Sequence, residues 1–140
     1  MSRVLFICTG NYYRSRFAEA VFNHHAALQA KHWSAFSRGL AIHMAEGDLS
    51  PLIHAALQDR QIPLERTGAT RVTLSAPDLE EASIRIALDD AEHRPMVRDR
   101  FPHWEDRVRF WEAPDAHIAA PEEVLPLIER LVLELLDSLN

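Results

Sequence analysis

Short apolar runs alternate with longer helical patterns along the chain, and this alternation constrains the fold most. Runs of strand-forming residues lie at 3–8, 32–37, 83–90 and 107–113. Between them, apolar residues recur at the spacing of one helix face from Phe17 to Leu28, and Pro51 can open a second helix. This regular order implies right-handed crossovers and a parallel sheet covered by helices on both faces. We therefore expect an α/β fold with a four-stranded parallel sheet.

Nothing in the sequence divides this pattern into parts. It contains no internal repeat, no low-complexity segment and no Gly/Ser-rich linker, and 47% of the 140 residues are hydrophobic. A chain of this length and composition can bury a core without disulfides or a structural metal. We expect residues 1–140 to form a single domain.

The charge balance excludes several classes of partner. A formal net charge of -6 argues against nucleic acid and against an anionic membrane surface. The apolar C-terminal stretch, residues 121–140, is interrupted by acidic and basic residues, which predicts a helix packed on the sheet rather than a membrane span. The single cysteine, with no secretory-type N-terminal segment, favours a cytoplasmic protein.

Metal chemistry has little support in the sequence. The eight His residues fit no ligand spacing typical of a metal site, and one Cys adds little. We expect no metal and no cofactor.

Residues capable of chemistry follow the predicted strands. Cys8 ends the first, Ser37 the second and Asp89–Asp90 the third, while Asp115 lies just past the fourth. Parallel sheets of this kind bind ligands outside the carboxyl ends of their strands. The sequence therefore predicts a site at that edge.

The stretch "VLFICTGNYYRSR" (4–16) predicts an anion-binding loop after the first strand. The loop residues are Thr9, Gly10, Asn11, Tyr12 and Tyr13, of which Gly10 and Asn11 tolerate a left-handed backbone. With a helix beginning near Arg14, backbone N–H groups and the positive end of the helix dipole converge on the space above Cys8.

Three side chains complete this loop. Arg14 offers a planar two-pronged donor that matches two phosphate oxygens. The same positive field stabilises a thiolate, so we expect Cys8 to be nucleophilic at neutral pH. Ser15 can donate its hydroxyl to that sulfur.

The spacing of Cys, five residues, Arg and Ser is that of the cysteine-dependent phosphatases. The segment "VLFICTGNYYRSRFAEA" resembles the signature of the low-molecular-weight protein tyrosine phosphatase family, which shares its fold with a group of arsenate reductases. "SRG" at 37–39, "LEEASIRIALDDAEH" at 79–93 and "WEAPDA" at 111–116 also resemble segments of that family.

The resemblance implies a role for each matching residue. Cys8 would be the nucleophile, Arg14 would bind the phosphoryl oxygens, and Asp115 would protonate the leaving oxygen. The supporting residues Asn11, Ser15 and Ser37 would hold the loop and the thiolate in place.

The acid role of Asp115 also has a chemical reason. A phosphoester oxygen leaves poorly as an anion, and a neutral carboxyl group within reach lowers that barrier. Asp89 and Asp90 have two interpretations: either assists Asp115 across the sheet edge, or either caps a helix that begins at Ala91. Asp90 is the next candidate for the acid.

The chain departs from the family pattern at three places. Tyr13 replaces a second cysteine, so the nucleophile cannot form a protective disulfide there. Arg16 replaces a Pro and is expected to add positive charge beside the mouth of the site. Ala116-His117 replaces a Pro and an aromatic pair, so the side wall for an aryl group must come from Tyr12, Trp111 or His117.

Three functions follow from these residues. The first is a phosphomonoester hydrolase, a protein tyrosine phosphatase in type, acting on a phosphorylated protein or a small phosphomonoester. The second is a module that binds an oxyanion without turnover, and the third is an arsenate reductase that uses an external thiol. The oligomeric state stays open.

Overall fold

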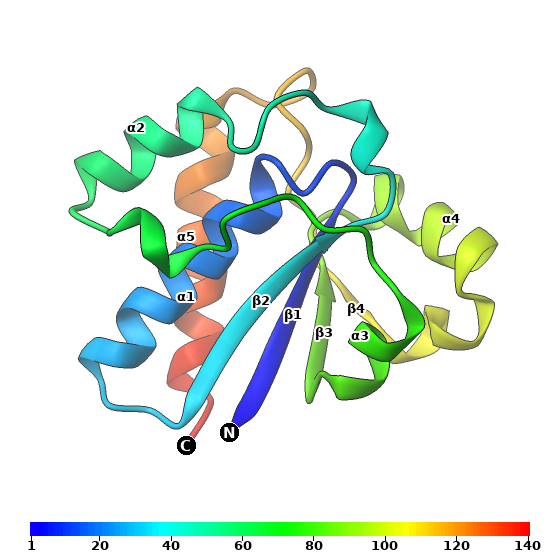
Figure 1. Cartoon of the computed structure of the whole chain (residues 1–140), viewed down its shortest axis with the longest axis horizontal. Coiled ribbons are helices and arrows are strands. Elements are labelled where there is room, and N and C mark those ends of the chain that lie inside the picture. The colour runs from blue at the N-terminus through cyan, green and yellow to red at the C-terminus, as the bar shows by residue number, and fades with distance from the viewer.

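A computed structural model describes all residues, 1–140, and contains one sheet of four parallel strands (Figure 1). The strands are β1 (Ser2–Cys8), β2 (Trp33–Gly39), β3 (Ile84–Ala87) and β4 (Arg109–Phe110), in the order β2-β1-β3-β4. The predicted α/β class, the number of strands and their parallel direction are confirmed.

Two strands are shorter than the sequence predicted. β3 ends at Ala87 because the chain turns at Leu88–Asp89 to begin a helix at Asp90. β4 contains only two residues, although Trp111 N–H still donates to the Ala87 carbonyl at 2.9 Å. The predicted strands at 83–90 and 107–113 therefore include residues that lead out of the sheet.

The central strand β1 is buried on both faces. It pairs with β2 along Ser2–Cys8 and with β3 along Val4–Ile7. Because successive side chains of a strand point to opposite faces, Val4 and Phe6 belong to one core cluster and Leu5 and Ile7 to the other. A continuous apolar run is what such a strand requires.

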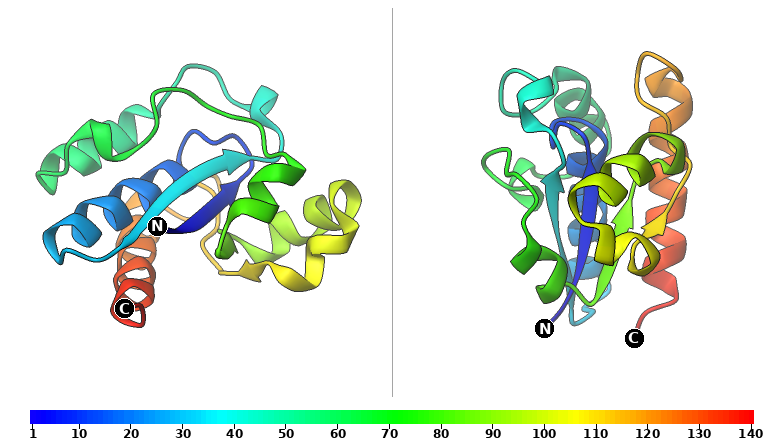
Figure 2. Two further views of the ribbon diagram at one scale, coloured as in Figure 1. Left: turned by 60° about the horizontal axis from the view of Figure 1, so that its bottom comes forward. Right: turned by 90° about the vertical axis from the view of Figure 1, so that its right-hand side faces the viewer.

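The helices cover the two faces unequally (Figures 1 and 2). α1 (Arg14–Leu28) and α5 (Pro121–Asp137) pack on the Phe6 face, with α2 (Pro51–Asp59) against α1. α3 (Ala76–Glu81) and α4 (Asp90–Arg100) contribute Leu79 and Val97 to the smaller core on the Ile7 face. Short 3-10 turns lie at Ile42–Met44, Leu64–Arg66 and Pro102–Arg107.

The C-terminal helix α5 is amphipathic, as the sequence predicted. Val124, Ile128, Val132 and Leu135 are buried against the sheet and α1, whereas the opposite side of the helix is charged. None of the helices combines the length and the apolar composition needed to cross a membrane.

The carboxyl ends of the strands meet at one edge, where the chain between β1 and α1 forms a tight loop (Figure 1). The segment after β2 is fixed beside it, because Leu40 and Ala41 donate backbone hydrogen bonds to the carbonyls of Cys8 and Thr9 at 2.9 and 2.8 Å. This edge is where the predicted site residues gather.

Candidate active site

The loop between Cys8 and Arg14 needs one residue in the left-handed region, and that residue is Asn11 (φ 51°). Gly10, the other residue of the loop that tolerates this conformation, does not have a positive φ. Gly10 is needed for space instead, because a Cβ at this position would lie 3.0 Å from Ala45 Cβ.

Asn11 also ties the loop to the rest of the molecule. Its Nδ2 donates to Ser15 Oγ at 3.0 Å and to Ser37 Oγ at 2.9 Å, and its Oδ1 accepts from Val72 N–H at 2.9 Å. Ser15 Oγ lies 2.8 Å from Cys8 Sγ. The structure thus brings together the three supporting residues and the sulfur that they were expected to serve.

Arg14 is the first residue of α1 and lies on the inner side of the loop, 2% exposed. Its Nη1 donates to the Ala113 carbonyl at 3.0 Å and its Nη2 to Glu92 Oε2 at 2.8 Å, while Nε donates to no protein acceptor. Burial opposes its charge, but the hydrogen bond that Arg14 donates to Glu92 and the charges of Cys8, Glu92 and Asp115 together raise the pKa of Arg14. The guanidinium is therefore fixed, charged and free to donate from Nε.

Arg16 does not lie at the mouth, contrary to the sequence expectation. Two residues along a helix turn a side chain by about 200°, so Arg16 points away from Arg14. It is 2% exposed and donates to Thr67 Oγ1 and to the Asp48 carbonyl, both at 2.7 Å, and to the Gly68 carbonyl. Its hydrogen bonds join α1 to the chain at Asp48 and at Thr67–Gly68.

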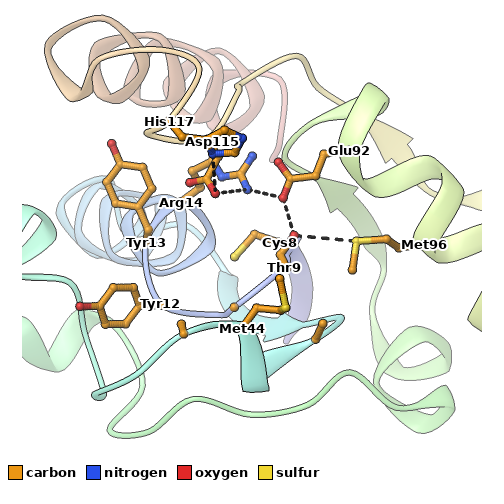
Figure 3. Close-up of a pocket in the computed structure, with 13 residues that line it drawn as sticks. Cys8, Thr9, Tyr12, Tyr13, Arg14, Met44, Glu92, Met96, Asp115 and His117 are labelled. Carbon is orange, nitrogen blue, oxygen red and sulfur yellow. Dashed lines mark hydrogen bonds and ion pairs between the residues drawn. The ribbon is translucent and has the colours of Figure 1, made fainter.

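These residues surround one cavity of about 650 Å³ above Cys8 (Figure 3). Eight residues predicted from the sequence line it, namely Cys8, Thr9, Gly10, Tyr12, Tyr13, Arg14, Asp115 and His117. The remaining lining comes from Ala41, Met44, Ala45, Glu92 and Met96. Of the three candidate wall residues, Tyr12 and His117 line the cavity, whereas Trp111 packs against Phe6 in the core, with ring centroids 5.8 Å apart.

Asp115 approaches Arg14 from the loop after β4. Its Oδ2 lies 3.8 Å from Arg14 Nη2 and 3.6 Å from His117 Nδ1, and its Oδ1 accepts the backbone N–H of Ala116 at 2.8 Å. The side chain is 36% exposed and stands on a turn closed by Ile118 N–H on the Asp115 carbonyl at 2.9 Å. The carboxyl group is therefore within reach of a ligand held by Arg14.

Of the two interpretations of Asp89 and Asp90, the structure supports the helix cap, and for Asp89 only. Asp89 is the N-cap of α4, and its side chain accepts from Glu92 N–H at 3.2 Å. Asp90 pairs with Arg94 at 2.7 Å and does not line the cavity. The helix begins at Asp90 rather than Ala91, and neither carboxylate contacts Asp115.

Sequence reasoning missed Glu92. The pattern Asp89-x-x-Glu92 predicts a capping box, in which the Glu would bond back to the N-cap N–H. In the structure His93 Nδ1 accepts that N–H at 3.0 Å, which frees Glu92 to reach Arg14 and Thr9. Burial acts to raise the pKa of Glu92, but hydrogen bonds from His93, Arg14 and Thr9 hold it well below its usual range.

The assembled groups are suited to displacement at a tetrahedral oxyanion. A buried sulfur lies under a loop at a helix N-terminus, a fixed guanidinium stands beside it, and a carboxyl group faces it across the cavity. No group of three or more His, Cys, Asp or Glu side chains converges as a metal site.

Solved structures of similar fold include a low-molecular-weight protein tyrosine phosphatase from T. tengcongensis, with 23% identity, a TM-score of 0.84 and coverage of 99% of this chain and 100% of that one. YfkJ from Bacillus subtilis matches with 25% identity and a TM-score of 0.82, covering 99% of this chain and 94% of its own. YwlE from the same organism, described as an arginine phosphatase, matches with 21% identity and a TM-score of 0.81, covering 97% and 94%. No curated protein matches the sequence significantly.

Residues 3–140 match the family profile described as low molecular weight phosphotyrosine protein phosphatase. The match spans nearly the whole chain, in agreement with the loop, the sheet order and the resemblance seen in the sequence. The chain belongs to the low-molecular-weight phosphotyrosine protein phosphatase family.

Proposed function

We propose that the chain hydrolyses phosphomonoesters through a cysteinyl-phosphate intermediate on Cys8. The observation that carries this proposal is the convergence in one cavity of Cys8, Arg14 and Asp115, with Ser15 Oγ 2.8 Å from the sulfur. Each group has a distinct chemical task, and no other residue is needed for the bond changes. A single catalytic thiol also suits a reducing, cytoplasmic compartment.

In the first step, the loop N–H groups and Arg14 bind the phosphoryl oxygens. The Cys8 thiolate forms a bond to phosphorus as the bond to the ester oxygen breaks. Asp115, protonated in this complex, gives its proton to the leaving oxygen. The charge that develops on the phosphoryl oxygens meets donors that are already in place, which is the main source of rate enhancement in sites of this kind.

In the second step, water replaces the alcohol that has left. Asp115, now a carboxylate, accepts a proton from the water as its oxygen attacks phosphorus and the P–S bond breaks. Inorganic phosphate leaves, and Cys8 returns to the thiolate. Ser15 stabilises that leaving thiolate by donating its hydroxyl hydrogen.

Phosphotyrosine is the first substrate candidate. The walls of the cavity are largely apolar, with Tyr12, Met44 and Met96 around the entrance (Figure 3). Aromatic and thioether side chains pack well against an aryl group. Tyr12 and His117 are the residues that would flank such a ring in place of the missing aromatic pair.

Phosphoarginine is the second candidate, and a specific feature favours it. The cavity contains two carboxylates, Glu92 and Asp115. Carboxylates interact more favourably with a cationic leaving group, such as a guanidinium, than with a neutral phenol. The fold is also similar to that of the arginine phosphatase YwlE. The same two steps apply, with a P–N bond in place of the P–O bond.

Turnover of phosphotyrosine and phosphoarginine, each assayed with the parent chain and Cys8→Ser, tests the proposal. We expect release of phosphate from at least one substrate and none above background from the variant. The ratio of kcat/KM values between the two substrates decides the leaving group. Tight binding of phosphate without turnover of either substrate would favour a binding module. Thiol-dependent reduction of arsenate without hydrolysis of either substrate would favour a reductase.

A further inference from the structure

Glu92 joins the two ends of the phosphate-binding loop. Thr9 is the first residue after Cys8, and Arg14 is the residue that ends the loop. Glu92 Oε2 accepts hydrogen bonds from the Thr9 hydroxyl and, at 2.8 Å, from Arg14 Nη2 (Figure 3). One carboxylate oxygen on α4 therefore fixes groups from the loop and from α1.

The position of this carboxylate is set independently of Arg14. His93 is fully buried, and because its Nδ1 accepts the Asp89 N–H at 3.0 Å, the ring hydrogen must be on Nε2. Nε2 lies 3.1 Å from Thr9 Oγ1 and 3.2 Å from Glu92 Oε2. The first turn of α4 thus presents Glu92 to the loop, and the buried His93 ring lies beside the Glu92 carboxylate and the Thr9 hydroxyl as a neighbour of both.

The contact has an electrostatic consequence. Glu92 places a negative charge inside a cavity whose backbone and guanidinium favour anions, and it occupies one amine of Arg14. Its lowered pKa keeps it charged at neutral pH. When a phosphate dianion is bound in the loop, the negative charge of Glu92 lies a few ångströms from it and weakens its binding. The same carboxylate that orders the loop therefore opposes occupation of it.

We propose that Glu92 is a positioning residue that aligns Arg14 and Thr9 for phosphoryl transfer and, through its charge, lowers the affinity of the loop for free phosphate so that the product leaves readily. The proposal rests on the phosphatase function proposed above. It separates two quantities, since alignment acts on turnover while charge acts on phosphate affinity.

Two variants of Glu92 test the two parts. Glu92→Gln keeps a hydrogen-bonding oxygen but removes the charge, and we expect the Kd for inorganic phosphate to fall about three- to tenfold. We expect kcat to fall about tenfold, because the amide holds Arg14 less firmly. Glu92→Asp keeps the charge but withdraws the carboxylate from Arg14, so kcat should fall while the Kd for phosphate stays within about twofold of the parent.

Phosphate affinity is measured by the protection of Cys8 from iodoacetate, which needs no turnover. Asp99→Asn is the matched control, because Asp99 is an exposed carboxylate on the same helix and its loss changes the net charge equally. This control should alter neither quantity. Melting curves verify that each variant is folded.

A weaker or unchanged affinity for phosphate in Glu92→Gln would overturn the proposal, and so would an undiminished kcat in both Glu92 variants. Lack of turnover in the parent would count against the proposed function and not against the affinity result. Affinity and kcat that decline together in Glu92→Gln would show a merely structural role and would also overturn the proposal.

Discussion

The two halves of the candidate active site are built differently. In the half around residues 8–15, Cys8 and Arg14 are each 2% exposed and Ser15 is 0% exposed. Its side chains bond to one another and to side chains of β2 and α4. In the half around residues 113–119, the side chain of Asp115 is 36% exposed and that of His117 72% exposed. Asp115 is positioned by one turn and by the N–H of the next residue.

The difference separates oxyanion binding from turnover. The buried half contains the nucleophile and the groups that donate hydrogen bonds to phosphate. Its one hydrogen bond to the exposed half runs from Arg14 to the Ala113 carbonyl. The exposed half contributes the proton. Changes in the exposed half should therefore alter catalysis while leaving phosphate bound, whereas changes in the buried half should damage both.

The largest effect should come from Asp115→Asn, which removes the acid and leaves the buried half intact. We expect phosphoenzyme formation to slow by about 10²- to 10⁴-fold for substrates with poor leaving groups and far less for activated aryl phosphates. Rates across a series of aryl phosphates measure this, and phosphate should still protect Cys8 from alkylation. Equal slowing across the series would mean that another residue supplies the proton.

Arg14→Lys damages the buried half instead. Lysine keeps the charge but cannot reach Ala113, Glu92 and a phosphoryl group with one planar fork. We expect kcat/KM to fall about 10²- to 10³-fold, with a parallel loss of phosphate affinity. Inhibition constants for phosphate and vanadate are the measurement, and an unchanged affinity would remove the contrast between the two halves.

Glu92→Gln should also change the pH dependence of stability. Folding lowers the pKa of Glu92 below the ordinary Glu value of 4.5, so its charge stabilises the fold at pH values above 4.5. This contribution to stability is lost progressively as the pH falls below 4.5. We expect the variant to be less stable by about 2 kcal/mol at neutral pH, and the gap to close in acid. Denaturant titrations at several pH values check this, and a gap independent of pH would contradict it.

The smallest effect concerns the exposed half. Ala116 occupies the second position of the turn that begins at Asp115, where Pro is favoured, and its N–H donates to Asp115 at 2.8 Å. The backbone N–H of Ala116, as a donor, favours the ionised carboxyl group over the protonated one. Ala116→Pro removes this donor and therefore favours the protonated acid. We expect rates with poor leaving groups to rise about fivefold, the equivalent of one hydrogen bond of about 1 kcal/mol. Ala116→Gly keeps the N–H and should show no such gain.

Local sequence signals predicted the buried half well. A continuous apolar run, a turn with Asn11, and Arg14 at a helix start are short-range features, so the strand, loop and helix appear where the sequence placed them. α3 was not predicted, although Ser75 and Asp78 form a capping box, because six residues give too few turns to show a helical period.

Side-chain directions across elements could not be predicted. Arg16 is buried against Thr67 and Gly68, which lie 51 and 52 residues further along the chain. Only the folded chain brings them together. Glu92 reaches Arg14 because His93 takes the N-cap hydrogen bond that the capping-box pattern assigns to Glu. Both side chains find these partners 51 to 78 residues distant in sequence, which a local pattern does not record.

Trapping the intermediate tests most directly whether the buried half performs covalent chemistry. Enzyme turning over an aryl phosphate is quenched in acid, digested and analysed by mass spectrometry. We expect one added phosphoryl group on the peptide that contains Cys8, formed at a rate at least equal to kcat. Hydrolysis that proceeds at full rate with Cys8 unmodified, or with the phosphoryl group on another residue, would contradict it.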